Sequence, residues 1–321
     1  MTRARDIATD ELVRGVSAGD RTALGRALTL VESAAEEDRE PAARLMAALP
    51  AHTSLRLALT GAPGAGKSTF LEALGMHVLA RGLRVGVLAV DPSSRRSGGS
   101  ILGDKTRMNV LARDERAFIR PTPSSGALGG VAPGTREGVR VLEAAGFDLV
   151  VVETVGIGQS EVEATSLVDT LVWITAPSGG DELQGIKRGL VESVDVVVVN
   201  KTDGERVQAA HITKAEIEAA LRYVPAATEA WSVPVILASA LEKQGIAEAF
   251  DAIVAHHAHL ETHGLLAARR RQQSVDSFRR ALERALVASL AHRPELAAIE
   301  KHVADGALTV EDAVARALLL R

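Results

Sequence analysis

The stretch LRLALTGAPGAGKSTFLEALGMHVLARG, residues 55–82, predicts a buried strand, a glycine-rich turn and an amphipathic helix in direct succession. Its centre, GAPGAGKS at residues 61–68, matches the phosphate-binding pattern G-x-x-x-x-G-K-S/T, and the flanking strand and helix are the context that this pattern requires. Small residues let backbone N–H groups turn towards phosphate oxygens, and the start of the helix adds a partial positive charge. The stretch therefore predicts a nucleotide-phosphate site in an α/β domain.

The side chains of this phosphate loop have separate expected roles. Lys67 would span the β- and γ-phosphates, and the hydroxyl of Ser68 would ligate Mg²⁺. The remaining residues that we expect to surround the phosphates are Gly61, Gly64, Ala65, Gly66 and Thr69. A nucleoside triphosphate with its magnesium ion is the ligand that this pattern predicts.

Apolar runs of strand length alternate with helix-sized segments between residues 55 and 255. The runs are LRLALT, RVGVLAV, FDLVVVE, DTLVWIT, VDVVVVN and VPVILAS. This alternation predicts an α/β fold, the P-loop NTPase parallel sheet flanked by helices. We expect residues 1–50 to form an N-terminal helical extension, residues 51–255 the P-loop domain and residues 256–321 a C-terminal helical arm.

The segment NKTD, residues 200–203, directly follows a fully apolar strand and indicates which base is bound. Asp203 can accept hydrogen bonds from N1–H and the 2-amino group of guanine, a donor pair that adenine lacks. Asn200 and Lys201 belong to the same expected guanine site. Ser239 and Ala240, in ILASA, stand where the backbone of a final loop usually meets the guanine O6. The sequence thus predicts GTP and GDP as ligands.

Two acidic residues end predicted strands, where parallel sheets gather their sites. Asp91 follows RVGVLAV, and Glu153 ends FDLVVVE at a position where most GTPases carry aspartate. The longer glutamate remains compatible with magnesium if a water mediates its contact. A third acid, Asp104, lies in ILGDKTRM, and Gly156 is expected to offer its N–H to the γ-phosphate. Asp91 and Glu153 should therefore both open towards the nucleotide phosphates, on the same side as the hydroxyl of Ser68.

Composition excludes several other classes of function. The chain has no cysteine, which excludes disulfides, thiolate metal sites and cysteine nucleophiles. Its 37 basic and 41 acidic residues give a formal charge of −4, and only 2% of residues are aromatic, so nucleic acid is a poor candidate partner. No apolar run approaches the roughly 18 residues that cross a bilayer. We therefore expect a soluble, cytoplasmic protein with neither a nucleic-acid nor a membrane partner.

Taken in order, the motifs resemble those of the MeaB/ArgK/MMAA GTPases, chaperones of adenosylcobalamin-dependent methylmalonyl-CoA mutase. The motifs that carry the resemblance are GAPGAGKST, VDPSS, GDKTRM, ETVGIGQSE, DELQGIK and NKTD. In that family the acid before T-x-G-x-G-Q is glutamate, so Glu153 is expected for this branch. The one small departure is Pro177-Ser178, where the typical family loop begins with Pro-Gly.

The resemblance implies roles that the residues alone do not give. Asp91, Asp104 and Glu153 would form the metal-side and switch carboxylates and, with Lys67, the catalytic set. Gln184 and Lys187 would belong to an additional switch loop that couples the nucleotide state to the mutase, which is the implied partner. A homodimer formed through the C-terminal arm is also implied. The GTP or GDP state would then gate the loading of the cobalamin cofactor.

The expected chemistry is slow GTP hydrolysis that a partner accelerates. Ile157 follows Gly156 where many small GTPases keep a glutamine that orients the attacking water, which favours a low intrinsic rate. Two alternatives remain open at this point. One is a GTPase chaperone that inserts metals, because imidazoles at helical spacing can bind a transition metal and the candidates are His256, His259 and His263. The other is a kinase linked to basic amino-acid transport. The NKTD segment is evidence against this alternative, because it disfavours ATP.

Overall fold

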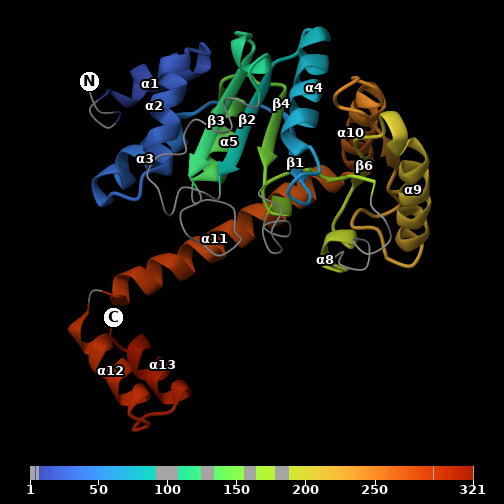
Figure 1. Ribbon diagram of the computed structural model, residues 1–321. Helices are drawn as coiled ribbons and strands as arrows, with labels where there is room; N and C mark the ends of the chain where they lie inside the picture. The colour runs from blue at the N-terminus through green and yellow to red at the C-terminus, as the bar shows by residue number, and fades with distance from the viewer. Residues whose placement is uncertain are drawn as a thin grey trace. The chain divides into compact units, whose positions relative to one another are not determined.

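The computed structural model describes residues 4, 7–91, 108–123, 134–154, 164–177, 188–291 and 293–320. Its strands are β1 (Leu55–Thr60), β2 (Val85–Asp91), β3 (Ala117–Pro123), β4 (Leu149–Glu153), β5 (Thr170–Thr175), β6 (Val196–Val199) and β7 (Val235–Leu237). They form one seven-stranded parallel sheet in the order β3-β2-β4-β1-β5-β6-β7 (Figure 1). The expected α/β fold with a parallel sheet is confirmed.

Helices cover both faces of this sheet. Those before and within it are α1 (Thr9–Ser17), α2 (Arg21–Glu32), α3 (Glu36–Ala48), α4 (Lys67–Ala80), α5 (Thr135–Ala144), α8 (Arg188–Val191) and α9 (Val207–Leu221). Those after it are α10 (Ile246–Thr262), α11 (Leu265–Ala291), α12 (Pro294–Ala304) and α13 (Val310–Leu318). Two short 3₁₀ turns, Leu111–Arg113 and Gly204–Arg206, complete the described elements.

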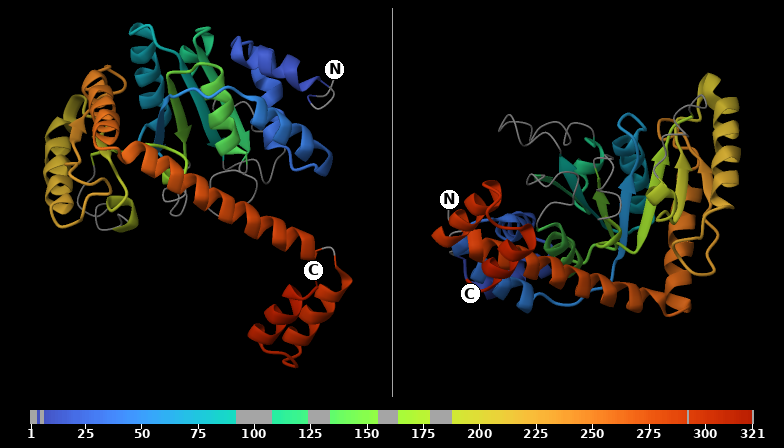
Figure 2. Two further views of the ribbon diagram at one scale, coloured as in Figure 1. Left: turned by 180° about the vertical axis from the view of Figure 1, so that it is seen from behind. Right: turned by 90° about the horizontal axis from the view of Figure 1, so that it is seen from below.

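Successive residues of each strand enter opposite halves of the core because side chains alternate across a sheet. In β4, Val150 and Val152 pack with α1, α2, α3, α5 and α9, whereas Leu149 and Val151 pack with α4 and α10. Burying both faces explains why the strands are continuous apolar runs. Figure 2 shows the strands between these layers from behind and from below.

The seventh strand, β3, was absent from the expected set. Its sequence AFIRPTP contains Pro121 and Pro123, and proline cannot donate a backbone hydrogen bond to a neighbouring strand. β3 lies at the edge of the sheet and pairs only with β2, so its prolines are tolerated there. Arg120 of the same strand reaches the carboxylate of Glu32 on α2, which connects the N-terminal helices to this edge.

The chain divides into two compact units, Met1–Leu266 and Ala267–Arg321. The first contains the sheet together with α1, α2 and α3, whose leucines share a core cluster with the strands. In the second, α12 packs against α13. The expected division into three domains, at residues 50 and 255, stays a prediction. The two compact units do not by themselves define domain boundaries.

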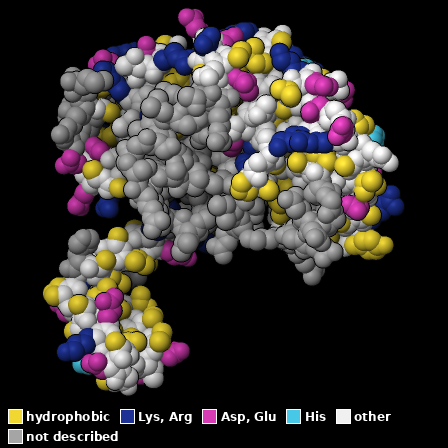
Figure 3. Space-filling view, in the orientation of Figure 1, with side chains coloured by type: hydrophobic (Ala, Val, Ile, Leu, Met, Phe, Trp, Pro, Cys, Tyr) yellow, Lys and Arg dark blue, Asp and Glu magenta, His cyan; other side chains and the backbone are white. Residues whose placement is uncertain are grey.

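The second unit exposes large apolar side chains, as the yellow atoms of its visible face indicate in Figure 3. Phe278 is 66% exposed, and the others include Val275, Leu282, Val287, Val314 and Leu318. No helix in the described ranges is both long and apolar enough to cross a membrane.

Candidate functional site

The candidate site lies at the carboxyl ends of β1 and β4, which are neighbours in the middle of the sheet. Leu59 of β1 is in register with Glu153 of β4, and the next residue, Thr154, donates its backbone N–H to Leu59 O at 3.0 Å. The phosphate loop leaves β1 just beyond this point. Two segments far apart in the sequence therefore meet where the strands end, as expected for a parallel sheet.

Glycine is required at two positions of the phosphate loop. Gly61 has φ +145°, and a Cβ there would lie 2.0 Å from the carbonyl oxygen of Ile174. Gly66 has φ +89°, and a Cβ there would lie 2.5 Å from the amide nitrogen of Asn200. Both approaches are closer than any side chain tolerates, so the turn depends on the absence of a Cβ. Helix α4 begins directly after it, at Lys67, and places its N-terminus at the loop.

Lys67 folds back over the loop that precedes it. Its Nζ donates to the carbonyl oxygens of Gly61 at 2.7 Å and of Ala62 at 3.2 Å. The ammonium group is thereby placed above the turn, where the phosphates of a bound nucleotide would lie. The expected contact of Lys67 with the β- and γ-phosphates stays a prediction.

Ser68 and Glu153, which are 85 residues apart in the sequence, meet at the carboxyl ends of β1 and β4. Ser68 Oγ donates to Glu153 Oε1 at 2.9 Å, and Glu153 is 8% exposed. A hydroxyl and a carboxylate are the hard oxygen ligands that Mg²⁺ prefers. The donor set therefore fits a magnesium ion held by Ser68, with Glu153 beside it.

Several expected residues fall outside the described part of the chain. Asp91 ends β2, but its side chain is not described. The others lie in the undescribed segments 92–107, 155–163 and 178–187, and they are Asp104, Gly156, Gln184 and Lys187. Their expected roles stay predictions.

Asn200 connects the base side of the site to the phosphate loop. It is 1% exposed, and its Nδ2 donates to Ala65 O at 3.1 Å while its Oδ1 accepts from Ala240 N at 3.0 Å. The side chain therefore joins three loops rather than pointing into open space. Lys201, next to it, has a left-handed backbone with φ +63°, which is uncommon outside glycine and turns the chain sharply after β6.

A hydroxyl group holds the carboxylate that is expected to read guanine. Ser239 Oγ donates to Asp203 Oδ1 at 2.8 Å and itself accepts from the backbone N–H of Glu242 at 3.1 Å. Sequence reasoning expected only a backbone contribution from Ser239 and missed this side-chain contact. The sequence did contain a signal for this contact. Ser239 is a hydroxyl residue at the end of the predicted strand VPVILAS, which would lie beside the strand that precedes NKTD.

Replacement of Ser239 by alanine is expected to weaken GDP binding by about 1 kcal/mol, roughly fivefold in Kd, because Asp203 loses the donor that orients it. Isothermal titration calorimetry on wild type and variant measures this change. The matched control is Ser289→Ala, whose exposed hydroxyl donates to the carbonyl oxygen of Leu286 within α11. Equal affinities for wild type and Ser239→Ala, with both proteins folded, would show that the hydroxyl does not orient Asp203.

The three histidines that suggested metal insertion do not form one cluster, because the rings of His259 and His263 lie 4.1 Å apart while His256 is held by other residues. His256 is fully buried, with Nδ1 2.8 Å from Thr170 Oγ1 and Nε2 3.0 Å from Thr228 Oγ1. His259 Nε2 instead lies 2.8 Å from the carbonyl oxygen of Glu229. Within the described ranges no cluster of three or more His, Asp or Glu side chains could hold a metal ion. These contacts give the metal-insertion alternative no support.

The parallel sheet, the phosphate loop at the end of β1 and the NKTD loop at the end of β6 define a P-loop GTPase. Residues 24–295 match the family model described as "Methylmalonyl Co-A mutase-associated GTPase MeaB". The chain belongs to the MeaB family.

Relatives and a solved structure agree with this assignment. A probable GTPase of Mycobacterium tuberculosis is 52% identical over 273 residues, covering 84% of this chain and 81% of the relative. The GTPase ArgK of Escherichia coli is 48% identical over 275 residues, covering 85% and 83%. A crystal structure described as an LAO/AO transport system kinase covers 97% of both chains with a TM-score of 0.79 and 36% identity.

Proposed function

We propose that this GTPase assists and protects adenosylcobalamin-dependent methylmalonyl-CoA mutase, and that its GTP and GDP states gate loading of the cobalamin cofactor. The observation that carries the proposal is the family match across residues 24–295, because the family is described by its association with that mutase. The fold alone would not support it, since P-loop domains serve many functions. GTP binding and hydrolysis are common to the family, and the coupling to a partner is the proposed part.

The proposed mechanism assigns positioning and charge neutralisation to this chain. Lys67, held above the loop by two carbonyl oxygens, would contact the β- and γ-phosphates, and backbone N–H groups at the start of α4 would contact phosphate oxygens. Ser68 would hold Mg²⁺, and the ion when bound would neutralise charge developing on the phosphate oxygens. The carboxylate of Glu153, which accepts a hydrogen bond from Ser68, would help to keep that ion in place. Hydrolysis then breaks the bond between the γ-phosphorus and its bridging oxygen as water attacks.

Asp91, Asp104 and Gly156 would complete the phosphate and metal side in this proposal, and Gln184 with Lys187 would transmit the nucleotide state to the partner. A homodimer formed through the C-terminal arm belongs to the same proposal. It is supported by the exposed apolar side chains of the second unit, which a second copy would cover.

The test is turnover of GTP and of ATP by the purified protein, with and without an adenosylcobalamin-dependent methylmalonyl-CoA mutase. We expect slow hydrolysis that is selective for GTP and that rises when the mutase is added, because Ile157 follows Gly156 where many small GTPases keep a glutamine that orients the attacking water. GTP-selective hydrolysis whose rate does not change when the mutase is added would refute the proposed partner. The assignment of the nucleotide site would still stand. Equal use of ATP would contradict the role of Asp203 and favour a kinase.

A further inference from the structure

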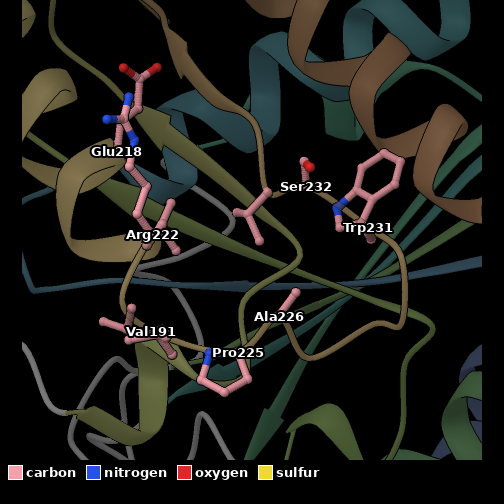
Figure 4. Close-up of a pocket in the computed structure, with 10 residues that line it drawn as sticks. Val191, Glu218, Arg222, Pro225, Ala226, Trp231 and Ser232 are labelled. Atoms are coloured by element: carbon pink, nitrogen blue, oxygen red, sulfur yellow. The ribbon is translucent and has the colours of Figure 1, made fainter.

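A cavity lies between α8, the end of α9 and residues 222–233 (Figure 4). Its volume is about 470 Å³, which falls in the range of small-molecule sites. Its wall is part polar and part apolar, and the apolar part includes Val191, Leu221, Val224, Pro225, Trp231 and Val233. A wall of this mixed composition favours a ligand that has both an apolar body and a polar group.

The loop that forms one wall is held in place by a buried polar cluster. Trp231 Nε1 donates to Asp195 O at 2.8 Å, and its ring packs edge-on against His256 with centroids 5.0 Å apart. Thr228 Oγ1 donates to Asp195 Oδ1 at 2.8 Å from inside the same cluster. Ala230, between them, keeps a left-handed backbone with φ +56°, a conformation that alanine adopts only where its surroundings fix it. The indole wall is therefore preformed rather than assembled by a ligand.

The polar part of the cavity contains one acidic and one basic side chain, Glu218 and Arg222. Glu218 and Arg222 lie on one side of it, across from Trp231 and Ser232 (Figure 4). Glu218 forms an ion pair with Lys214 at 3.6 Å, which offsets its negative charge. Within the described part of the chain Arg222 forms no ion pair, so its guanidinium, which presents paired N–H donors, can bind a carboxylate.

We propose that this cavity, defined by Arg222 and Trp231, binds a small amphipathic carboxylate whose apolar body lies against the wall and whose anion meets Arg222. A peptide with an apolar side chain next to an acidic residue would present the same two groups to the cavity. The small molecule is favoured because the cavity is of small-molecule size and its indole wall is fixed in advance. The proposed mutase partnership is not needed for this inference.

The test uses 4-phenylbutyrate and its neutral amide as probes on the full chain. The chain has two tryptophans, and Trp173 is buried in β5, so emission from Trp231 should report binding. We expect saturable binding of the carboxylate, with the amide weaker by about tenfold or more because it forms no charge-assisted contact. Isothermal titration calorimetry gives the same comparison without relying on fluorescence.

Arg222→Gln is expected to remove the preference for the carboxylate over the amide while leaving GTP hydrolysis and the melting temperature unchanged. Arg222 is exposed, so this variant should fold. Arg284→Gln, an exposed arginine on α11, serves as the matched control and should bind like wild type. Equal binding of both probes to wild type, no saturable binding of either probe, or saturable binding only of an acidic leucine-containing peptide would each overturn the proposal.

Discussion

Lys67→Ala is expected to lower kcat for GTP hydrolysis by roughly 10²–10³-fold, the range that follows loss of one preorganised donor at a developing charge. The Lys67 ammonium lies over the phosphate loop, 2.7 Å from Gly61 O. Alanine cannot place a positive charge at this position. Affinity for GTP should fall as well, because the same group contacts the ground-state phosphates. Single-turnover hydrolysis with saturating GTP separates the two effects.

The control for this variant is Lys301→Ala, which removes an exposed lysine from α12 in the second compact unit. It should hydrolyse GTP like wild type. A thermal melt of Lys67→Ala checks the fold, since the lost contacts are two hydrogen bonds to loop carbonyls. A folded Lys67→Ala protein that retains wild-type kcat would show that the phosphate loop has been assigned the wrong role.

Asp203→Asn is expected to weaken GTP binding by about 1.5–3 kcal/mol, or roughly 10–100-fold, because guanine loses a charged acceptor for N1–H and the 2-amino group. The same change should improve binding of xanthosine triphosphate. Xanthine carries a carbonyl oxygen where guanine carries the 2-amino group, and the new amide can donate to that oxygen. Competition titrations with GTP, ATP and xanthosine triphosphate measure the exchange of specificity.

A gain for xanthosine triphosphate cannot come from a misfolded protein, which makes this variant its own control for folding. Asp305→Asn, at the end of α12, is the matched change outside the site and should leave all three affinities unchanged. If Asp203→Asn weakens the three nucleotides equally, Asp203 acts through loop structure and does not read the base.

Most of the sheet could be predicted because each central strand is an uninterrupted apolar run. β4 and β6 are buried along their whole length, so the run and the strand coincide within a few residues. β3 could not be predicted in the same way. Its two prolines and Arg120 break the apolar pattern, and only its place at the sheet edge makes such a strand possible.

The sequence alone determined those parts of the site that lie within one short segment. The turn at residues 61–68 and the NKTD segment carry their chemistry in consecutive residues, so their pattern is sufficient to assign them. The sequence also gives the acid at the end of β4, because strand ends are visible in the hydrophobic pattern.

Only the tertiary structure decided which of these segments touch. Ser68 meets Glu153, Asn200 meets Ala65 and Ala240, and Ser239 meets Asp203 because β1 lies between β4 and β5 and β6 lies beside β7. An apolar strand is equally well buried next to several different neighbours, so its pattern does not encode strand order. The hydrogen bonds that depend on that order appear only once the sheet is assembled.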